Sequence, residues 1–226
     1  MALDLVDFES MAKEAVMAFW MNRELSPQKQ VNRDKSDHEE GSCIATGKNM
    51  EGFLALMKAL VLHNGLKHTD IQLARRVLTL PGHFGPTKQW DMLVMSEGRL
   101  VAAVELKSRI APMAGDDCSD RAEAIVAAHD LWTAYREGAF GHQSPPFVGL
   151  LVISEEFEKA SHADRYDIMC RKLMKERLYT AASVIVAPRT AATSGEYGEL
   201  SEMTGLRWFV AGLAGHVAAQ AALKKR

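Results

Sequence analysis

The chain has 226 residues, of which 47% are hydrophobic and 25% charged, and a formal net charge of −2. These values are ordinary for a soluble globular protein with a full core, and they give no global basic signal for nucleic-acid binding. No apolar run approaches the roughly 20 residues of a membrane span, and the acidic N-terminus lacks the features of a signal peptide. With three widely spaced cysteines, we expect a cytoplasmic protein whose thiols are reduced.

Hydrophobic spacing predicts an α/β protein. The elements expected in chain order are a helix over 4–22, a polar segment over 25–42, a helix over 49–64, an extended segment over 71–80, a hairpin over 90–108, a helix over 120–137, a strand over 147–153, a helix over 163–179, a strand over 182–187, a flexible loop over 195–205 and a helix over 206–223. The polar segment is either a solvated loop or one that orders on a partner such as DNA. This order predicts a central mixed β-sheet flanked by helices.

The hairpin carries the strongest functional signal. Asp91 stands at the start of its first strand, and Glu105 and Lys107 stand two apart on its second strand. Residues at i and i+2 of a strand point to the same face, so Glu105 and Lys107 share a side. If Asp91 lies beside them after the turn at 96–98, two carboxylates and an ammonium converge. That combination predicts a site for a divalent metal ion and a phosphate, as in a nuclease.

A Glu-x-Lys tripeptide is common by chance, and its simplest explanation is a solvated ion pair at a strand end. Here, however, Glu105 follows the apolar run Leu100–Val104, which predicts a central strand. A carboxylate in such a strand needs a partner or a metal, because burying a bare charge is costly. The oxygen ligands expected for Mg²⁺ are the carboxylates of Asp91 and Glu105 and the carbonyl of Leu106, and Lys107 would orient or help deprotonate the attacking water.

Further candidates come from outside the hairpin. Glu51, near the start of the second helix, is either a third acid of the site or an acid that complements the helix dipole. The basic residues proposed for phosphate contact are Lys48, Lys88, Arg109 and Arg121, although most surface cations are only solvated.

Asp91, then thirteen residues, then Glu105-Leu106-Lys107 resembles the core motif of the PD-(D/E)XK nucleases, with Trp90 in place of the proline. A narrower resemblance, from about residue 40 to 190, is to the XhoI family of type II restriction endonucleases. The segments that carry it are Thr46–Phe53, Leu80–Gly82, Trp90–Asp91, Val104–Ser108, Ala128–Phe140, Arg165–Ile168 and Glu176–Tyr179. The stretch Thr133–Gly138 within them is far more specific than Glu-x-Lys.

The resemblance implies a Mg²⁺-dependent homodimeric endonuclease that cuts double-stranded DNA at a palindromic, CTCGAG-like site and leaves 5′-phosphate products. It also implies a restriction-modification system, in which a cognate methyltransferase protects host DNA. By position, Asp91, Glu105 and Lys107 become the catalytic set, with Glu51 as the helix acid. The chain departs from the family at Gly115–Arg121, where relatives are asparagine-rich, and is shorter between residues 153 and 163. Both departures bear on the recognised bases more than on the chemistry. In the first, the residue types matter because asparagine and arginine read base edges.

We expect one nuclease domain with three parts: an N-terminal helix and polar loop (1–45), the PD-(D/E)XK core (46–190), and a C-terminal loop and helix (191–226). Two alternatives stay open on sequence alone. One is a nuclease of the same fold in DNA repair or mobile-element defence that cuts by DNA structure. The other is an inactive DNA-binding module.

Overall fold

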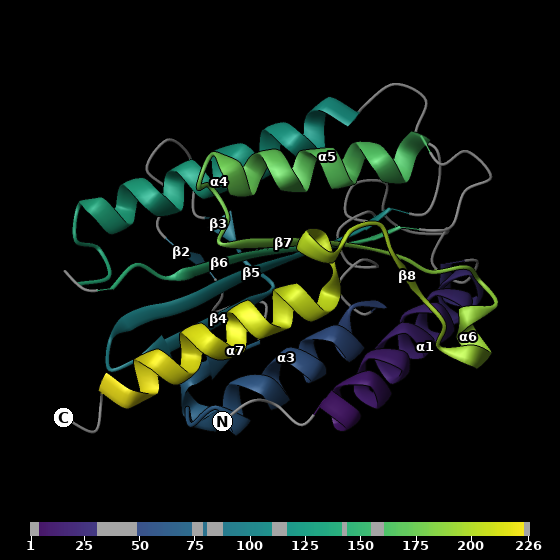
Figure 1. Ribbon diagram of the computed structural model, residues 1–226, viewed down its shortest axis with the longest axis horizontal. Coiled ribbons are helices and arrows are strands. Elements are labelled where there is room, and N and C mark those ends of the chain that lie inside the picture. The colour runs from purple at the N-terminus through teal and green to yellow at the C-terminus, as the bar shows by residue number, and fades with distance from the viewer. Residues whose placement is uncertain are drawn as a thin grey trace.

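The computed structural model describes residues 5–30, 49–73, 79–80, 88–109, 117–141, 144–154 and 161–223. A six-stranded mixed sheet lies between two layers of helices (Figure 1). Its strands, in spatial order, are β1 (Ile71–Gln72), β4 (Met92–Ser96), β5 (Arg99–Arg109), β6 (Phe147–Ser154), β7 (Ala181–Val186) and β8 (Gly198–Glu199). A separate two-stranded sheet pairs β2 (Thr79–Leu80) with β3 (Lys88–Gln89). The prediction of an α/β fold with a mixed central sheet is confirmed.

The helices are α1 (Leu5–Gln30), α3 (Glu51–His63), α4 (Asp117–Arg136), α5 (Ser161–Lys175), α6 (Ala191–Ser194) and α7 (Leu206–Leu223), with short 3₁₀ turns η1 (His68–Asp70) and η2 (Glu202–Thr204). Helices α4 and α5 lie side by side on one face of the sheet, and α1, α3 and α7 cover the other (Figure 1). In the described part of the chain, no helix is long and apolar enough to cross a membrane.

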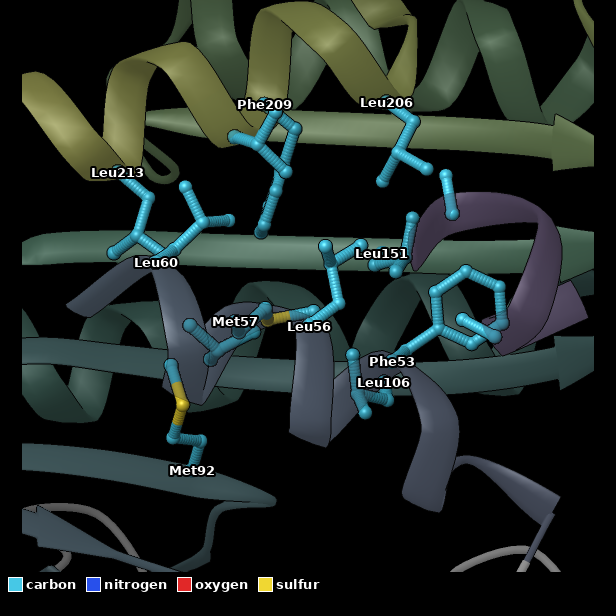
Figure 2. Packing of buried hydrophobic residues seen from close by; sticks show 14 of the residues in the cluster. Phe53, Leu56, Met57, Leu60, Met92, Leu106, Leu151, Leu206, Phe209 and Leu213 are labelled. Carbon is cyan, nitrogen blue, oxygen red and sulfur yellow. The ribbon is translucent and has the colours of Figure 1, made fainter. Parts of the chain in front are cut away.

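Strand alternation divides the core between the two faces. One cluster joins α1, α3 and α7 to residues such as Leu106 and Leu151, and Figure 2 shows these side chains meeting Phe53, Leu56 and Phe209. A second cluster joins α4 and α5 to the opposite face of the same strands. Strand β6, between β5 and β7, is buried along its whole length because helices cover both of its faces.

The predicted hairpin is confirmed. Strands β4 and β5 pair antiparallel, with Met92 opposite Val104 and Ser96 opposite Arg99. The two residues between them, Glu97 and Gly98, both have positive φ angles, of 54° and 77°. That conformation matches the right-handed twist of a two-residue hairpin, and glycine adopts it at no steric cost.

Three predicted helix boundaries and one predicted loop are wrong. The first helix continues to Gln30, well past residue 22, and α4 begins at Asp117 rather than at 120. Helix α5 ends at Lys175, so Tyr179 belongs to the turn before β7 and not to a helix. The expected loop over 195–205 contains β8, which extends the sheet beside β7, and η2. Residues 31–42 of the expected polar segment and 74–78 of the extended segment lie outside the described residues.

Candidate active site

The hairpin places Asp91 beside the acid-bearing part of β5. Asp91 sits at a bend just before β4, and its backbone amide donates to the carbonyl of Val104 at 3.1 Å. Its side chain turns toward the same strand, where Oδ2 accepts the backbone amide of Leu106 at 2.7 Å. These two bonds tie Asp91 to β5 at the residues on either side of Glu105, which is the arrangement that the sequence set as a condition for a shared site.

Glu105 and Lys107 share the α4-facing side of β5. Lys107 Nζ lies 3.1 Å from Glu105 Oε1, and the two side chains are only 11% and 7% exposed. Leu106, between them, points to the opposite face and packs against α3 (Figure 2). The predicted sharing of one face is confirmed, but the pair is buried, not solvated.

A second carboxylate holds the lysine. Glu123, on α4, accepts a hydrogen bond from Lys107 Nζ at 2.8 Å. Burial by itself would lower the pKa of Lys107, but the charges of Glu105 and Glu123 outweigh it and raise that pKa above 10.5. Glu123 was not among the residues predicted from the sequence, because its position depends on how α4 returns over the sheet, which no local spacing encodes.

Tyr179 is a further neighbour of Glu105, and it too was not predicted from the sequence. Its hydroxyl has one proton, which Glu105 Oε2 at 3.2 Å and the carbonyl oxygen of Ala124 at 3.1 Å share as acceptors. Burial, followed by the neighbouring charge of Glu105, raises the pKa of Tyr179 well above its ordinary value, so the hydroxyl keeps its proton. The only sequence signal was the place of Tyr179 in a family-like segment.

The other predicted site residues are not brought to this cluster. Glu51 is an exposed first residue of α3, on the opposite face of the sheet from α4 (Figure 1). Among the basic candidates, Lys48 lies outside the described residues, Lys88 belongs to β3, Arg109 ends β5 and Arg121 lies in α4.

The donor set of the cluster fits Mg²⁺. Within the described ranges, no three of His, Cys, Asp and Glu stand close enough together to hold a metal ion by themselves. Mg²⁺ does not require such a cage, because it commonly uses one or two carboxylates and completes its shell with water and substrate phosphate oxygens. Asp91, whose carboxylate accepts the Leu106 amide, and Glu105, the residue before Leu106 in β5, are the two carboxylates that would hold it.

Comparison with known proteins places this chain in a family. The model of the restriction endonuclease XhoI family matches residues 29–156 and 151–199. The chain is 52% identical to the type II restriction enzyme AbrI of Azospirillum brasilense over 157 residues, which are 69% of this chain and 70% of that enzyme. It is 41% identical to XhoI of Xanthomonas vasicola over 77% of this chain and 78% of XhoI. It is 32% identical to BstVI of Geobacillus stearothermophilus over 85% of this chain and 98% of BstVI.

The family match and these relatives show that the chain is a restriction endonuclease, an enzyme that hydrolyses phosphodiester bonds within DNA. More narrowly, the chain belongs to the XhoI restriction endonuclease family, as the sequence resemblance predicted. No solved structure gives a significant match to the chain.

Proposed function

We propose that this enzyme cuts double-stranded DNA at a specific palindromic site in a Mg²⁺-dependent reaction. The observation that carries the proposal is the convergence of Asp91, Glu105 and Lys107 at the hairpin, in a chain whose relatives are named type II restriction enzymes. Site-specific cleavage needs a phosphate-activating centre and a reader of base sequence, and the hairpin is the candidate for the first.

Asp91 and Glu105 would hold the metal ion. When bound, Mg²⁺ lowers the pKa of a coordinated water and offsets charge on the phosphate under attack. The ammonium of Lys107 is paired with Glu105 and Glu123, so it lies beside the proposed metal site, where it would orient the attacking water and stabilise developing negative charge. Glu51 is proposed as a helix acid from the family resemblance alone.

The recognised sequence is proposed to be CTCGAG-like, with 5′-phosphate products. A palindromic site favours a symmetric homodimer, because each subunit can then read one half-site and cut one strand. Lys48, Lys88, Arg109 and Arg121 are proposed to contact phosphates. The enzyme would work beside a methyltransferase that protects the host DNA without forming a stable complex with it.

Digestion of plasmid and phage DNA tests the proposal. Purified protein is incubated with DNA and Mg²⁺, with EDTA in a parallel reaction, and the fragment ends are sequenced. We expect discrete fragments only with Mg²⁺, with ends that share one palindrome. Cutting at branches or ends instead of at a sequence would identify a structure-specific nuclease, and no cutting in any sequence context would indicate an inactive DNA-binding protein.

A further inference from the structure

We propose that Tyr179 is a positioning residue, whose hydroxyl fixes the carboxylate of Glu105 in the orientation that the reaction needs. The inference rests on the proposed function, because it concerns the same acid. Tyr179 comes from a different part of the chain, 74 residues beyond Glu105, and contacts it in a buried environment. Tyr179 is only 1% exposed, so its hydroxyl contacts groups inside the protein and cannot contact DNA.

The need for such a residue follows from the chemistry of a glutamate side chain. The terminal torsion of a glutamate is broad, so one partner leaves the carboxylate plane free to turn. Lys107 engages Oε1, and the Tyr179 hydroxyl engages Oε2, so that each oxygen has its own partner. Every carboxylate oxygen retains a further acceptor site, which leaves Glu105 able to bind a cation while its plane stays fixed.

The segment around Tyr179 is itself anchored on both sides. The carbonyl of Leu178 accepts the indole N–H of Trp132 on α4 at 2.8 Å. On the other side, the Thr180 amide donates to the Val148 carbonyl at 2.8 Å, and the Val148 amide donates to Thr180 Oγ1 at 3.1 Å. These bonds tie the residues before and after Tyr179 to a helix and to a central strand, which makes the hydroxyl a fixed reference point.

Tyr179 could instead have only a structural role, in which its hydrogen bond to the carbonyl of Ala124 links the segment before β7 to α4. The two roles differ in what happens to Glu105 when the hydroxyl is removed. A structural link predicts lower stability and an unchanged site. A positioning residue predicts a weakened metal site and slower cleavage in a protein that still folds and binds DNA.

The test compares Tyr179→Phe with wild type, with Glu105→Gln, and with Tyr197→Phe as a matched control. Tyr197 loses the same hydroxyl but packs against the cluster on the other face of the sheet. Four quantities are measured: urea unfolding, DNA binding in EDTA, the single-turnover cleavage rate at saturating DNA, and binding of Mn²⁺ alone, followed by electron paramagnetic resonance.

For Tyr179→Phe we expect a cleavage rate and a Mn²⁺ affinity each lowered by about tenfold or more, as for loss of other outer partners of metal ligands. DNA affinity should stay within about twofold of wild type, and Tyr197→Phe should match wild type in every measurement. In a Glu105→Gln background, the effect of Tyr179→Phe on Mn²⁺ binding should disappear, because the hydroxyl acts through that carboxylate.

Rate and Mn²⁺ affinity within twofold of wild type would overturn the inference, provided that Glu105→Gln abolishes cleavage. If wild type does not cleave, or if Glu105→Gln still cleaves, the proposed function fails instead. Should Tyr179→Phe not fold, Trp132→Phe takes its place, since it keeps the hydroxyl but releases the Leu178 anchor. It should lower the rate at least threefold, and an unchanged rate there would also overturn the inference.

Discussion

The backbone amide of Leu106 donates a 2.7 Å hydrogen bond to the carboxylate of Asp91, fifteen residues earlier in the chain. Its donor belongs to the residue between Glu105 and Lys107, so the bond fastens Asp91 to the strand that carries the other acid. One oxygen of Asp91 thus serves the backbone, and the carboxylate still carries the charge that a metal ion requires. Geometry and charge at this position can be separated by mutation.

Asp91→Asn keeps an acceptor for the Leu106 amide but removes the charge. We expect its free energy of unfolding to stay within about 1 kcal/mol of wild type. Its Mg²⁺-dependent cleavage rate should fall by at least about 100-fold, because loss of a metal ligand costs at least as much as loss of an outer partner. Single-turnover cleavage and urea unfolding measure the two effects. Glu97→Gln, an exposed acid at the tip of the same hairpin, is the control and should cleave normally.

Cleavage by Asp91→Asn at the wild-type rate would remove Asp91 from the catalytic set. If cleavage falls only because the protein unfolds, the role of Asp91 is to stabilise the hairpin and not to supply a charge. Removal of divalent metal with EDTA should bring wild type to the residual rate of the variant, since both changes disable the same site.

Lys107 and Glu123 should differ sharply in their effect on stability. Lys107→Met leaves Glu105, whose side chain is 7% exposed, without its countercharge, and breaking such a buried pair costs about 3 kcal/mol or more. Glu123 is 56% exposed, so Glu123→Gln should cost less than about 1 kcal/mol. Urea unfolding in metal-free buffer measures both changes. The double variant Lys107→Met with Glu105→Gln should recover much of the lost stability, and equal losses for the two single variants would contradict this account.

The sequence could predict the parts of the site that are local. Asp91 lies at the bend just before β4, and Glu105 and Lys107 lie on β5, so the two-residue turn brings Asp91 to β5 while strand alternation places Glu105 and Lys107 on one face. Glu123 and Tyr179 could not be predicted, because their contacts depend on how α4 and β7 return to β5 across 16 and 74 residues. The helix predicted over 163–179 also hid the role of Tyr179, because it placed this residue inside a helix instead of in the turn before β7. Polar composition over 25–30 likewise predicted a loop, although helix formation does not require apolar residues.

Two glycines should respond in opposite directions to the same substitution. A Cβ added at Gly149 on β6 would lie 2.8 Å from the rings of Phe147 and Phe209, which are packed edge to face. Gly149→Ala should therefore lower the free energy of unfolding by about 1–3 kcal/mol through overpacking. At Gly215 on α7, a Cβ meets nothing within 4 Å, so Gly215→Ala should raise stability by about 0.5–1 kcal/mol. Thermal or urea unfolding measures whether each substitution raises or lowers stability. A stabilised Gly149→Ala would show that the two rings move apart freely.

His216 on α7 should make the protein less stable in mild acid. Burial lowers the pKa of its imidazole below the ordinary 6.5, and a hydrogen bond with the backbone of Val101 only partly offsets the effect. The ring packs against Phe147, with centroids 6.2 Å apart, and its Nε2 is buried without a partner among the described residues. As pH falls below 6.5, the unfolded chain therefore binds a proton that the folded protein resists.

The contribution of His216 is complete above pH 6.5 and is lost as pH falls toward the lowered folded pKa, by at most about 1.4 kcal/mol per pH unit. Because the chain has eight histidines, other groups contribute to the pH dependence between pH 5.5 and 7.5, and the informative quantity is the difference between variants. Urea unfolding at pH 7.5 and 5.5 should show a smaller loss for His216→Gln than for wild type. His129→Gln, at an exposed histidine of α4, should lose as much as wild type. Equal losses in all three proteins would mean that the His216 ring is protonated in the folded state without penalty.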